Sequence, residues 1–250
     1  MHRIIFEIGP FTLYSYGLVV SFAFLLGTIL VVRDAGRYGM PVDSVFDTMI
    51  AVLAGGLVGG RILFVLVNWD HYSRDLFGIF KFYEGGLAIQ GALLGAVLAG
   101  VAVTRARKIS FWRTSDLIAP YIALGQSIGR IGCFLNGCCY GKVIEGGLGV
   151  TFPGETVMRI PVQLYSSLGL LVIFAVLIRL RNRPHFDGLI FTMYLILYSG
   201  FRFFMDFMRA DNPAALYNMT LAQLISIGML VCGAGLYVWL RRIGDRSYLS

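Results

Sequence analysis

Apolar residues are gathered into seven long runs that are separated by short polar links. Each run holds about 20 residues, which is enough to cross a bilayer as a helix. The pattern therefore predicts an all-α integral membrane protein with seven transmembrane helices, folded as a single domain over residues 1–250. The expected spans are Tyr14–Val32, Val45–Val67, Gly86–Thr104, Ser115–Cys133, Pro161–Ile178, Gly188–Met208 and Met219–Leu240.

The composition excludes a water-soluble domain. Hydrophobic residues make up 57% of the chain and charged residues 14%, with a mean hydropathy of +0.75, whereas soluble proteins are about 25% charged. The first span is preceded by His2, Arg3 and Glu7 and lacks a small-residue cleavage site, so a cleaved signal peptide is not expected. The net charge of +7 is spread over short loops without a basic stripe, so nucleic acid is not an expected partner.

The basic residues predict the orientation of the chain. The links after spans 1, 3 and 5 and the C-terminal tail hold 12 lysines and arginines, and the N-terminus with the other three links holds 6. Because positive charge is retained on the cytoplasmic side, we expect the N-terminus outside and the C-terminus in the cytoplasm. The largest outer link, residues 141–160, contains glycine and proline turns and is expected to form an external loop or small cap.

The remaining three basic residues, Arg61, Arg130 and Arg202, lie inside predicted spans. An intramembrane cation costs several kcal/mol without a partner and is therefore a candidate functional residue. With the predicted orientation and a rise of about 1.5 Å per residue, all three fall in the outer half of the bilayer, at the level of Tyr16 and Gln90. The polar groups of the bundle are thus expected to meet at one depth.

Two interpretations of these arginines stay open. Asp206 follows Arg202 by four residues, so the two side chains share a helix face, and the pair is equally consistent with a structural ion pair and with a functional site. No acid is expected at matching depth for Arg61 or Arg130, so a lipid or substrate anion is the better partner there, and the planar guanidinium suits phosphate. Glycines around Arg130 also allow a broken helix with free N–H groups.

Glycine and cysteine positions carry less information. Gly55, Gly56, Gly59 and Gly60 in the second span, with Gly91 and Gly95 in the third, form small-x-x-x-small pairs typical of close helix packing. The spacing Cys133-x4-Cys138-Cys139 has no adjacent histidine and matches no familiar zinc or redox pattern. These cysteines are interpreted as packing residues, with oxidation of the adjacent pair as the lesser alternative. No metal and no diffusible cofactor are expected.

Several motifs together resemble one family along nearly the whole chain. They are Ile8-Gly9-Pro10 with Tyr16-Gly17, Gly59-Gly60-Arg61, Glu84-Gly85-Gly86-Leu87, Ser115-Asp116-Leu117-Ile118-Ala119-Pro120, the run from Gly129 to Gly141, Pro161-Val162-Gln163-Leu164-Tyr165, and Phe201-Arg202-Phe203 through Arg209-Ala210-Asp211. In order and spacing, they resemble the bacterial phosphatidylglycerol–prolipoprotein diacylglyceryl transferases.

The resemblance implies a multi-pass enzyme of the bacterial plasma (inner) membrane whose active site lies toward the outer leaflet. Such an enzyme transfers the diacylglyceryl group of phosphatidylglycerol to the lipobox cysteine of a preprolipoprotein signal peptide, the first step of lipoprotein maturation, and uses no cofactor beyond the lipid itself. It implies a phosphate-handling role for Arg130 and Arg202. The other family positions that match here are Tyr16, Asn136 and Gly141, and we add Arg61 as a candidate lipid contact.

Three positions depart from the family pattern. Gln90 stands where the family has histidine, Cys133 replaces the first asparagine of the signature, and Cys138 replaces its glutamate. Glutamine is no general base, so we expect Gln90 and Tyr16 to orient substrate while the arginines stabilise the departing phosphate. The departures keep two alternatives open: a divergent transferase with another lipid donor or acceptor, and a non-catalytic lipid-binding or transport relative. The absence of inverted repeats disfavours transport.

Overall fold

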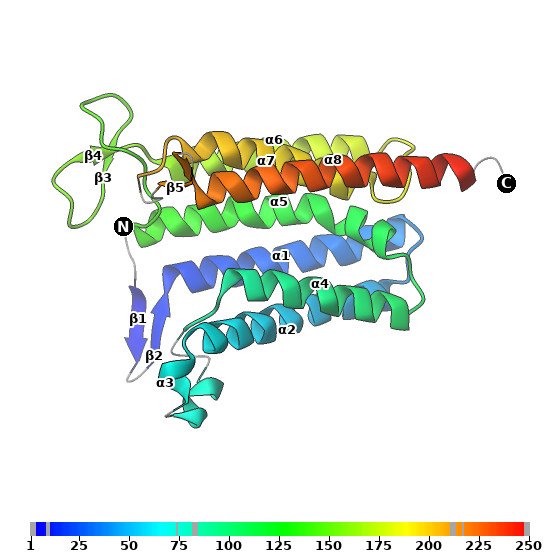
Figure 1. The fold of residues 1–250 in the computed structure, drawn as a ribbon, viewed down its shortest axis with the longest axis horizontal. Coiled ribbons are helices and arrows are strands. Elements are labelled where there is room, and N and C mark those ends of the chain that lie inside the picture. The colour runs from blue at the N-terminus through cyan, green and yellow to red at the C-terminus, as the bar shows by residue number, and fades with distance from the viewer. Residues whose placement is uncertain are drawn as a thin grey trace. The chain divides into compact units, whose positions relative to one another are not determined.

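A computed structural model describes residues 4–8, 11–73, 75–81, 85–210, 214–216 and 218–247. Figure 1 shows the elements along the chain. The chain divides into two units, and the boundaries between them fall inside two of the long helices. Unit 1 comprises residues 1–31 and 115–250, and unit 2 comprises residues 32–114. Each unit is described by itself.

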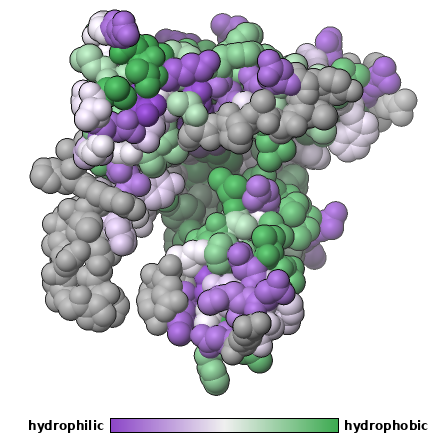
Figure 2. Space-filling model, turned by 60° about the vertical axis from the view of Figure 1, so that its left-hand side comes forward, coloured by the Kyte–Doolittle hydropathy of each residue, from purple (hydrophilic) through white to green (hydrophobic). Residues whose placement is uncertain are grey.

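Among the described residues, seven helices are long and apolar enough to span a membrane, which confirms the predicted all-α class. They are α1 (Ser15–Arg37), α2 (Val42–Val67), α4 (Ile89–Ala106), α5 (Phe111–Asn136), α6 (Val162–Arg181), α7 (Leu189–Asp206) and α8 (Leu221–Ser247). Their surfaces are rich in exposed large apolar side chains, among them Leu25, Leu94 and Leu168. Figure 2 shows such hydrophobic residues together on the face that it draws. This exposure is expected where lipid, rather than water, is the solvent.

The remaining described elements are short and lie before α1 or in the links between the long helices. They are the helices α3 (Trp69–Tyr72) and η1 (Leu76–Phe80), and the antiparallel strand pairs β1 (Ile4–Ile8) with β2 (Phe11–Tyr14), β3 (Val150–Thr151) with β4 (Met158–Arg159), and β5 (Ala214–Leu216) with β6 (Met219–Thr220). The pair β3–β4 lies within residues 141–160, the segment expected to form an external loop or cap. Its Phe152 is 2% exposed and packs edge-to-face on Phe134 of α5, with ring centroids 5.9 Å apart.

Unit 2 is built on close packing between α2 and α4. A Cβ added at Gly59 would lie 2.9 Å from Gly95 Cα, and one added at Gly55 would lie 2.6 Å from the Gly95 carbonyl oxygen. The two backbones are therefore in direct contact, as the small-x-x-x-small pattern predicts.

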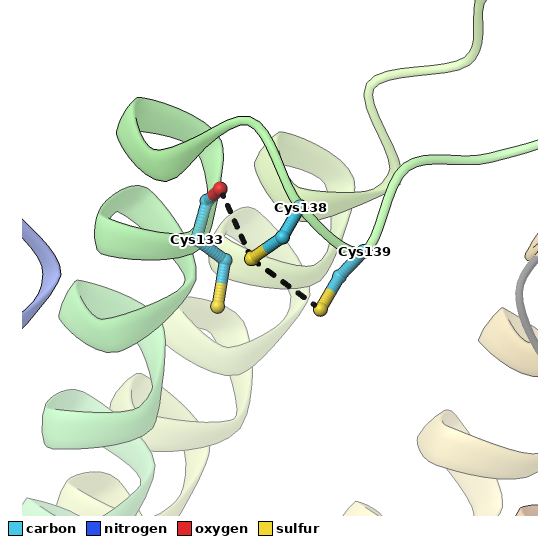
Figure 3. A group of neighbouring side chains, drawn as sticks. All are labelled: Cys133, Cys138 and Cys139. Carbon is cyan, nitrogen blue, oxygen red and sulfur yellow. Dashed lines mark hydrogen bonds between the residues drawn. The ribbon is translucent and has the colours of Figure 1, made fainter. Parts of the chain in front are cut away.

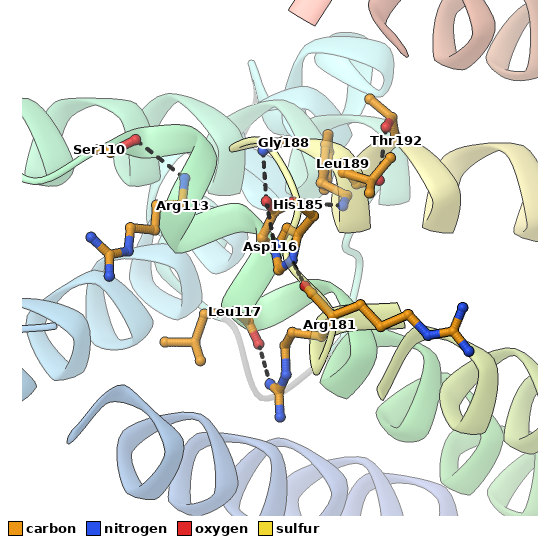
Figure 4. Close-up of polar contacts among 11 residues, drawn as sticks. Ser110, Arg113, Asp116, Leu117, Arg181, His185, Gly188, Leu189 and Thr192 are labelled. Atoms are coloured by element: carbon orange, nitrogen blue, oxygen red, sulfur yellow. Dashed lines mark hydrogen bonds and ion pairs between the residues drawn. The ribbon is translucent and has the colours of Figure 1, made fainter. Parts of the chain in front are cut away.

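Unit 1 has its core where α5, α6 and α7 meet. Ala119 and Ala123 of α5 pack against Leu170 and Ile173 of α6 and Tyr194 of α7. The start of α7 is held by an acid of α5 (Figure 4): the buried Asp116 carboxylate accepts hydrogen bonds from Gly188 N at 2.6 Å and Phe191 N at 2.8 Å. A carboxylate at a helix N-terminus satisfies free N–H groups and favours the helix dipole. The contact fixes α7, which carries Arg202 at its other end.

Candidate active site

The signature segment begins in an unbroken helix. The expectation of a helix break around Arg130 is wrong, because α5 continues to Asn136. One of these glycines serves packing instead: a Cβ added at Gly132 would lie 3.2 Å from Val19 Cγ1 and 3.4 Å from Tyr16 Cδ2 of α1. Gly132 thus allows the first turn of α1, with Tyr16, to approach the end of α5.

The C-terminal cap of α5 determines where the next residues lie. Gly137 has a φ of 69°, in the left-handed region that glycine adopts without strain. Gly137 N donates to Phe134 O at 3.1 Å, and Cys138 N donates to Cys133 O at 3.2 Å. This pair of hydrogen bonds is a Schellman motif. It returns the chain over the last turn and places Cys138 beside Cys133.

Three thiols consequently gather at this helix end (Figure 3). The Sγ atoms of Cys133, Cys138 and Cys139 all lie within 4.8 Å of one another, and those of Cys138 and Cys139 are 3.7 Å apart. Cys139 has a φ of 62°, an uncommon conformation for a residue other than glycine. Hydrogen bonding from Cys133, together with Arg209, lowers the pKa of the Cys139 thiol to about 5. The cysteine spacing did not predict this cluster, because it depends on the cap geometry at Gly137.

Arginines from two helix ends face the same region of unit 1. Arg202 Nη2 lies 3.4 Å from Asp206 Oδ1, and the Asp206 side chain is fully buried. The spacing of four residues therefore does place these groups in an ion pair. Asp206 also accepts a hydrogen bond from Thr220 Oγ1, which fixes the carboxylate. The positive charges of Arg130 and Arg209 both act on the Arg202 guanidinium, so three cations form a cluster in which Arg130 and Arg209 lie within electrostatic range of Arg202.

Tyr16 and Arg130 belong to this cluster. Tyr16 is 43% exposed and lies within electrostatic range of Arg130 and of the three cysteines. Arg130 is half-buried and makes no hydrogen bond or ion pair with any residue that the structure describes. Its guanidinium is therefore available to an oxyanion.

Asn136 and Gly141 support the turn after α5. Asn136 Nδ2 donates to Cys138 Sγ at 3.6 Å. Gly141 N donates to Ile160 O at 2.9 Å, and a Cβ at this position would lie 2.8 Å from that same oxygen. Gly141 also forms a β-bridge with Arg209. The close approach of the backbone explains the glycine, so the contacts of Gly141 give it a packing role.

An open apolar pocket of about 460 Å³ lies beside this turn. Three lining residues come from the 141–160 segment, one from the start of α6 and one from the residues just after α7. They are Ile144, Leu148, Ile160, Tyr165 and Met208. Such a lining suits an aliphatic group.

The two other predicted site residues, Arg61 and Gln90, lie in unit 2. Arg61 is 3% exposed and donates to five carbonyl oxygens of residues 78–86, at 2.6 Å to Gly78 and Gly85, 2.8 Å to Ile79, 3.1 Å to Gly86 and 3.3 Å to Lys81. It also lies over the Tyr72 ring, 5.4 Å from the centroid. These contacts give Arg61 a structural role, and its expected contact with lipid stays a prediction. Gln90 is exposed in the first turn of α4.

Comparison with known proteins identifies the family. Residues 3–239 match the family described as prolipoprotein diacylglyceryl transferase. The phosphatidylglycerol--prolipoprotein diacylglyceryl transferase of Halalkalibacterium halodurans is 35% identical over 97% of this chain and 87% of its own length. The enzyme of the same name from Geobacillus kaustophilus is 35% identical over 98% of this chain and 94% of its own length. The chain belongs to the prolipoprotein diacylglyceryl transferase family. This membership confirms the resemblance drawn from the motifs.

Two family motifs contain supporting residues whose roles the sequence did not indicate. In this prolipoprotein diacylglyceryl transferase family member, Asp116 lies in the run Ser115–Pro120 and caps α7. Gln163, from the run Pro161–Tyr165, is 1% exposed and donates from Nε2 to Cys138 O at 2.7 Å. An acid and an amide inside apolar spans were the available signal, because buried polar groups are retained only with partners.

Proposed function

We propose that this protein transfers the diacylglyceryl group of phosphatidylglycerol to the lipobox cysteine thiol of a preprolipoprotein and releases glycerol phosphate. The names of the relatives supply the reaction class. The observation that carries the proposal is that Arg130 lies within electrostatic range of Arg202. Asp206 orients the Arg202 guanidinium, and the Arg130 guanidinium has no hydrogen bond or ion pair with a described residue.

The reaction is an alkyl transfer that needs a stabilised leaving group. The acceptor sulfur bonds to the terminal carbon of the diacylglyceryl group, while the bond from that carbon to the phosphate oxygen breaks. The electron pair stays on the phosphate, so negative charge develops where the leaving group departs. Fixed cations in a water-poor site stabilise such charge because they need no reorganisation. Asp206 orients Arg202 for this task, and Arg130 can bind a phosphate oxygen through its planar fork.

The acceptor must react as a thiolate. Gln90 cannot remove the proton, and the described part of unit 1 offers no histidine near Arg130; its His185 lies near Asp116, at the other end of α5. The positive field of Arg130, Arg202 and Arg209 favours the thiolate. We assign Tyr16 the orientation of the incoming sulfur or the ester oxygens, because its hydroxyl lies within range of Arg130.

We place the protein in the bacterial inner membrane with this site toward the outer leaflet. The distribution of lysine and arginine among the links supports this orientation. On this arrangement phosphatidylglycerol reaches the arginines from the lipid side, and the signal peptide reaches them from the outer face.

A second candidate is a related transferase that uses another lipid donor or acceptor. The replacement of three family positions by Gln90, Cys133 and Cys138 favours it. The two candidates share the arginine site and differ only in substrate.

Transfer of labelled diacylglycerol from phosphatidylglycerol to a lipobox peptide, by the purified protein in detergent, tests the proposal. We expect transfer by the native protein and a loss of at least about 100-fold in Arg130→Ala, the scale seen when one charge-stabilising donor is removed. Arg183→Ala, at an exposed loop arginine of the same unit, is the matched control and should leave transfer unchanged. A folded native protein that binds phosphatidylglycerol without transferring it contradicts the first candidate and favours the second.

A further inference from the structure

We infer that Cys133, Cys138 and Cys139 form a binding site for one thiophilic divalent cation, with Zn²⁺ as the best match, and that the cation takes the acceptor thiol as its fourth ligand. The second part rests on the proposed function; the first does not.

The distances among the thiols fit one ion. Zn²⁺ binds cysteine sulfur at about 2.3 Å in tetrahedral geometry, which separates the sulfurs by roughly 3.8 Å. The Sγ atoms of Cys138 and Cys139 are 3.7 Å apart, and all three sulfurs lie within 4.8 Å of one another. Side-chain movements of about 1 Å therefore suffice to bring three sulfurs onto one ion.

The backbone holds the three residues in this arrangement. The Schellman motif fixes Cys138 against Cys133 through the hydrogen bond from Cys138 N to Cys133 O. The buried Gln163 amide holds the Cys138 carbonyl. The left-handed backbone of Cys139 turns its thiol to the side of the other two (Figure 3). A conformation of this kind costs about 1 kcal/mol or more outside glycine, and such strain occurs most often at functional sites.

The surrounding groups suit a thiolate site. Three thiolates and one Zn²⁺ carry a net charge of −1. Arg130 lies within electrostatic range of Cys133, and Arg209 within range of Cys139, so both place positive charge near the site. Asn136 Nδ2 donates to Cys138 Sγ, and hydrogen bonds to ligating sulfur commonly fix a metal ligand in place. The spacing C-x4-C-C alone does not predict a metal, because it matches no familiar ligand pattern; the cap geometry is what makes it suitable.

A disulfide is the competing use of these thiols. It would join only two of the three sulfurs and would need an oxidant, and the third thiol would have no function. A cation uses all three without a redox step. Three protein ligands also leave the fourth tetrahedral position open, as in catalytic rather than structural zinc sites.

The open position offers the acceptor thiol the activation that Gln90 cannot supply. On binding, the thiol loses its proton to solvent and is held as a thiolate at neutral pH. Its sulfur then bonds to the glyceryl carbon, and the carbon–oxygen bond to phosphate breaks with the electron pair on oxygen. The product is a neutral thioether, which binds the cation more weakly than the thiolate and is released.

Metal content of the purified protein tests the first part. We expect about one zinc per chain by inductively coupled plasma mass spectrometry, and no zinc in Cys133→Ser/Cys138→Ser/Cys139→Ser. Cys232→Ser, at the exposed cysteine of α8, is the control and should retain the metal.

A second measurement does not depend on variants. In the native protein, removal of the metal by a chelator should expose three further thiols to a small alkylating reagent. A reduced, zinc-supplemented native protein without bound metal overturns the proposal.

Cobalt substitution tests the second part without an activity assay. Co²⁺ should give a near-ultraviolet sulfur-to-cobalt band that changes on addition of a lipobox peptide with cysteine, and that does not change with the serine peptide. A band with no response to the cysteine peptide overturns thiol binding at the cation. If the band responds but no lipid is transferred, the cation site stands and the proposed function fails. If transfer persists at the native rate after chelation, the activating role is overturned.

Discussion

Arg61 and Arg130 are the same side chain at similar positions in two predicted spans, and their surroundings differ. Arg61 gives its donors to the carbonyl oxygens of one loop. Arg130 is half-buried beside other cations and gives none to any described residue. For these two arginines, the better candidate for a functional residue is the one whose N–H donors are not already bound to other groups of the protein. The sequence shows the type and depth of each residue, and the loop around Arg61 was not readable from it.

The two arginines should respond differently to substitution. Arg61→Met removes five hydrogen bonds and leaves buried carbonyls unpaired, so we expect a loss of at least about 3 kcal/mol in unfolding free energy. Arg130→Met removes no such contact and should leave stability within about 1 kcal/mol. Thermal unfolding in detergent measures both. Loss of phosphatidylglycerol binding by Arg61→Met at unchanged stability would instead establish Arg61 as a lipid contact.

At the scale of elements, contacts between helices are made by the smallest residues. The packing of α2 on α4 depends on Gly55, Gly59, Gly91 and Gly95, whose missing side chains let the backbones meet. Overpacking such a contact typically costs 1–3 kcal/mol.

Gly59→Ala should therefore lower the unfolding free energy by about 1–3 kcal/mol, because its Cβ would lie 2.9 Å from Gly95 Cα. Gly27→Ala is the matched control: it is also helical but has nothing within 4 Å, so the substitution should be neutral or stabilising by about 0.5–1 kcal/mol. Denaturation in detergent, followed by circular dichroism, compares the two. Equal effects would show that α2 and α4 are not in backbone contact.

The attachment of α7 to α5 gives a second expectation at this scale. Asp116→Ala removes two charge-assisted hydrogen bonds from the start of α7 and should cost about 2–4 kcal/mol. Asp187→Ala, at an exposed acid one residue before Gly188, should cost less than about 1 kcal/mol. Hydrogen exchange of the first turn of α7 reports the local effect, and unchanged protection in Asp116→Ala would contradict this role.

At the scale of the whole molecule, the sequence predicts more of the fold than of the candidate site. The seven spans were predicted because lipid demands long apolar helices, and their ends differ from the structure by a few residues. The strand pairs, whose strands are two to five residues long, were missed because such short strands carry little periodic signal. The ion pair of Arg202 with Asp206 follows from helix spacing, whereas the thiol cluster depends on the φ angles of Gly137 and Cys139, which no spacing rule reports.

The orientation of the chain is a prediction for the whole molecule. Green fluorescent protein fused after Ser250 should fluoresce in bacterial cells, and alkaline phosphatase fused at the same position should be inactive, because the positive-inside rule places this end in the cytoplasm. Phosphatase activity without fluorescence would reverse the topology and move the arginines to the inner leaflet.

The two attachments of α7 have a consequence for how the site responds to changes in bilayer thickness. One end of α7 is held by Asp116 of α5. Just beyond its other end, Met208 O accepts a hydrogen bond at 3.0 Å from Lys142 N, in the segment that follows α5, so the two helices are connected near both ends over about 27 Å. A thicker or thinner bilayer must tilt such helices together, and the separation of the Arg130 and Arg202 guanidinium groups then stays constant. Turnover in vesicles should therefore change little as the acyl chains of the host lipid are lengthened or shortened by two carbons.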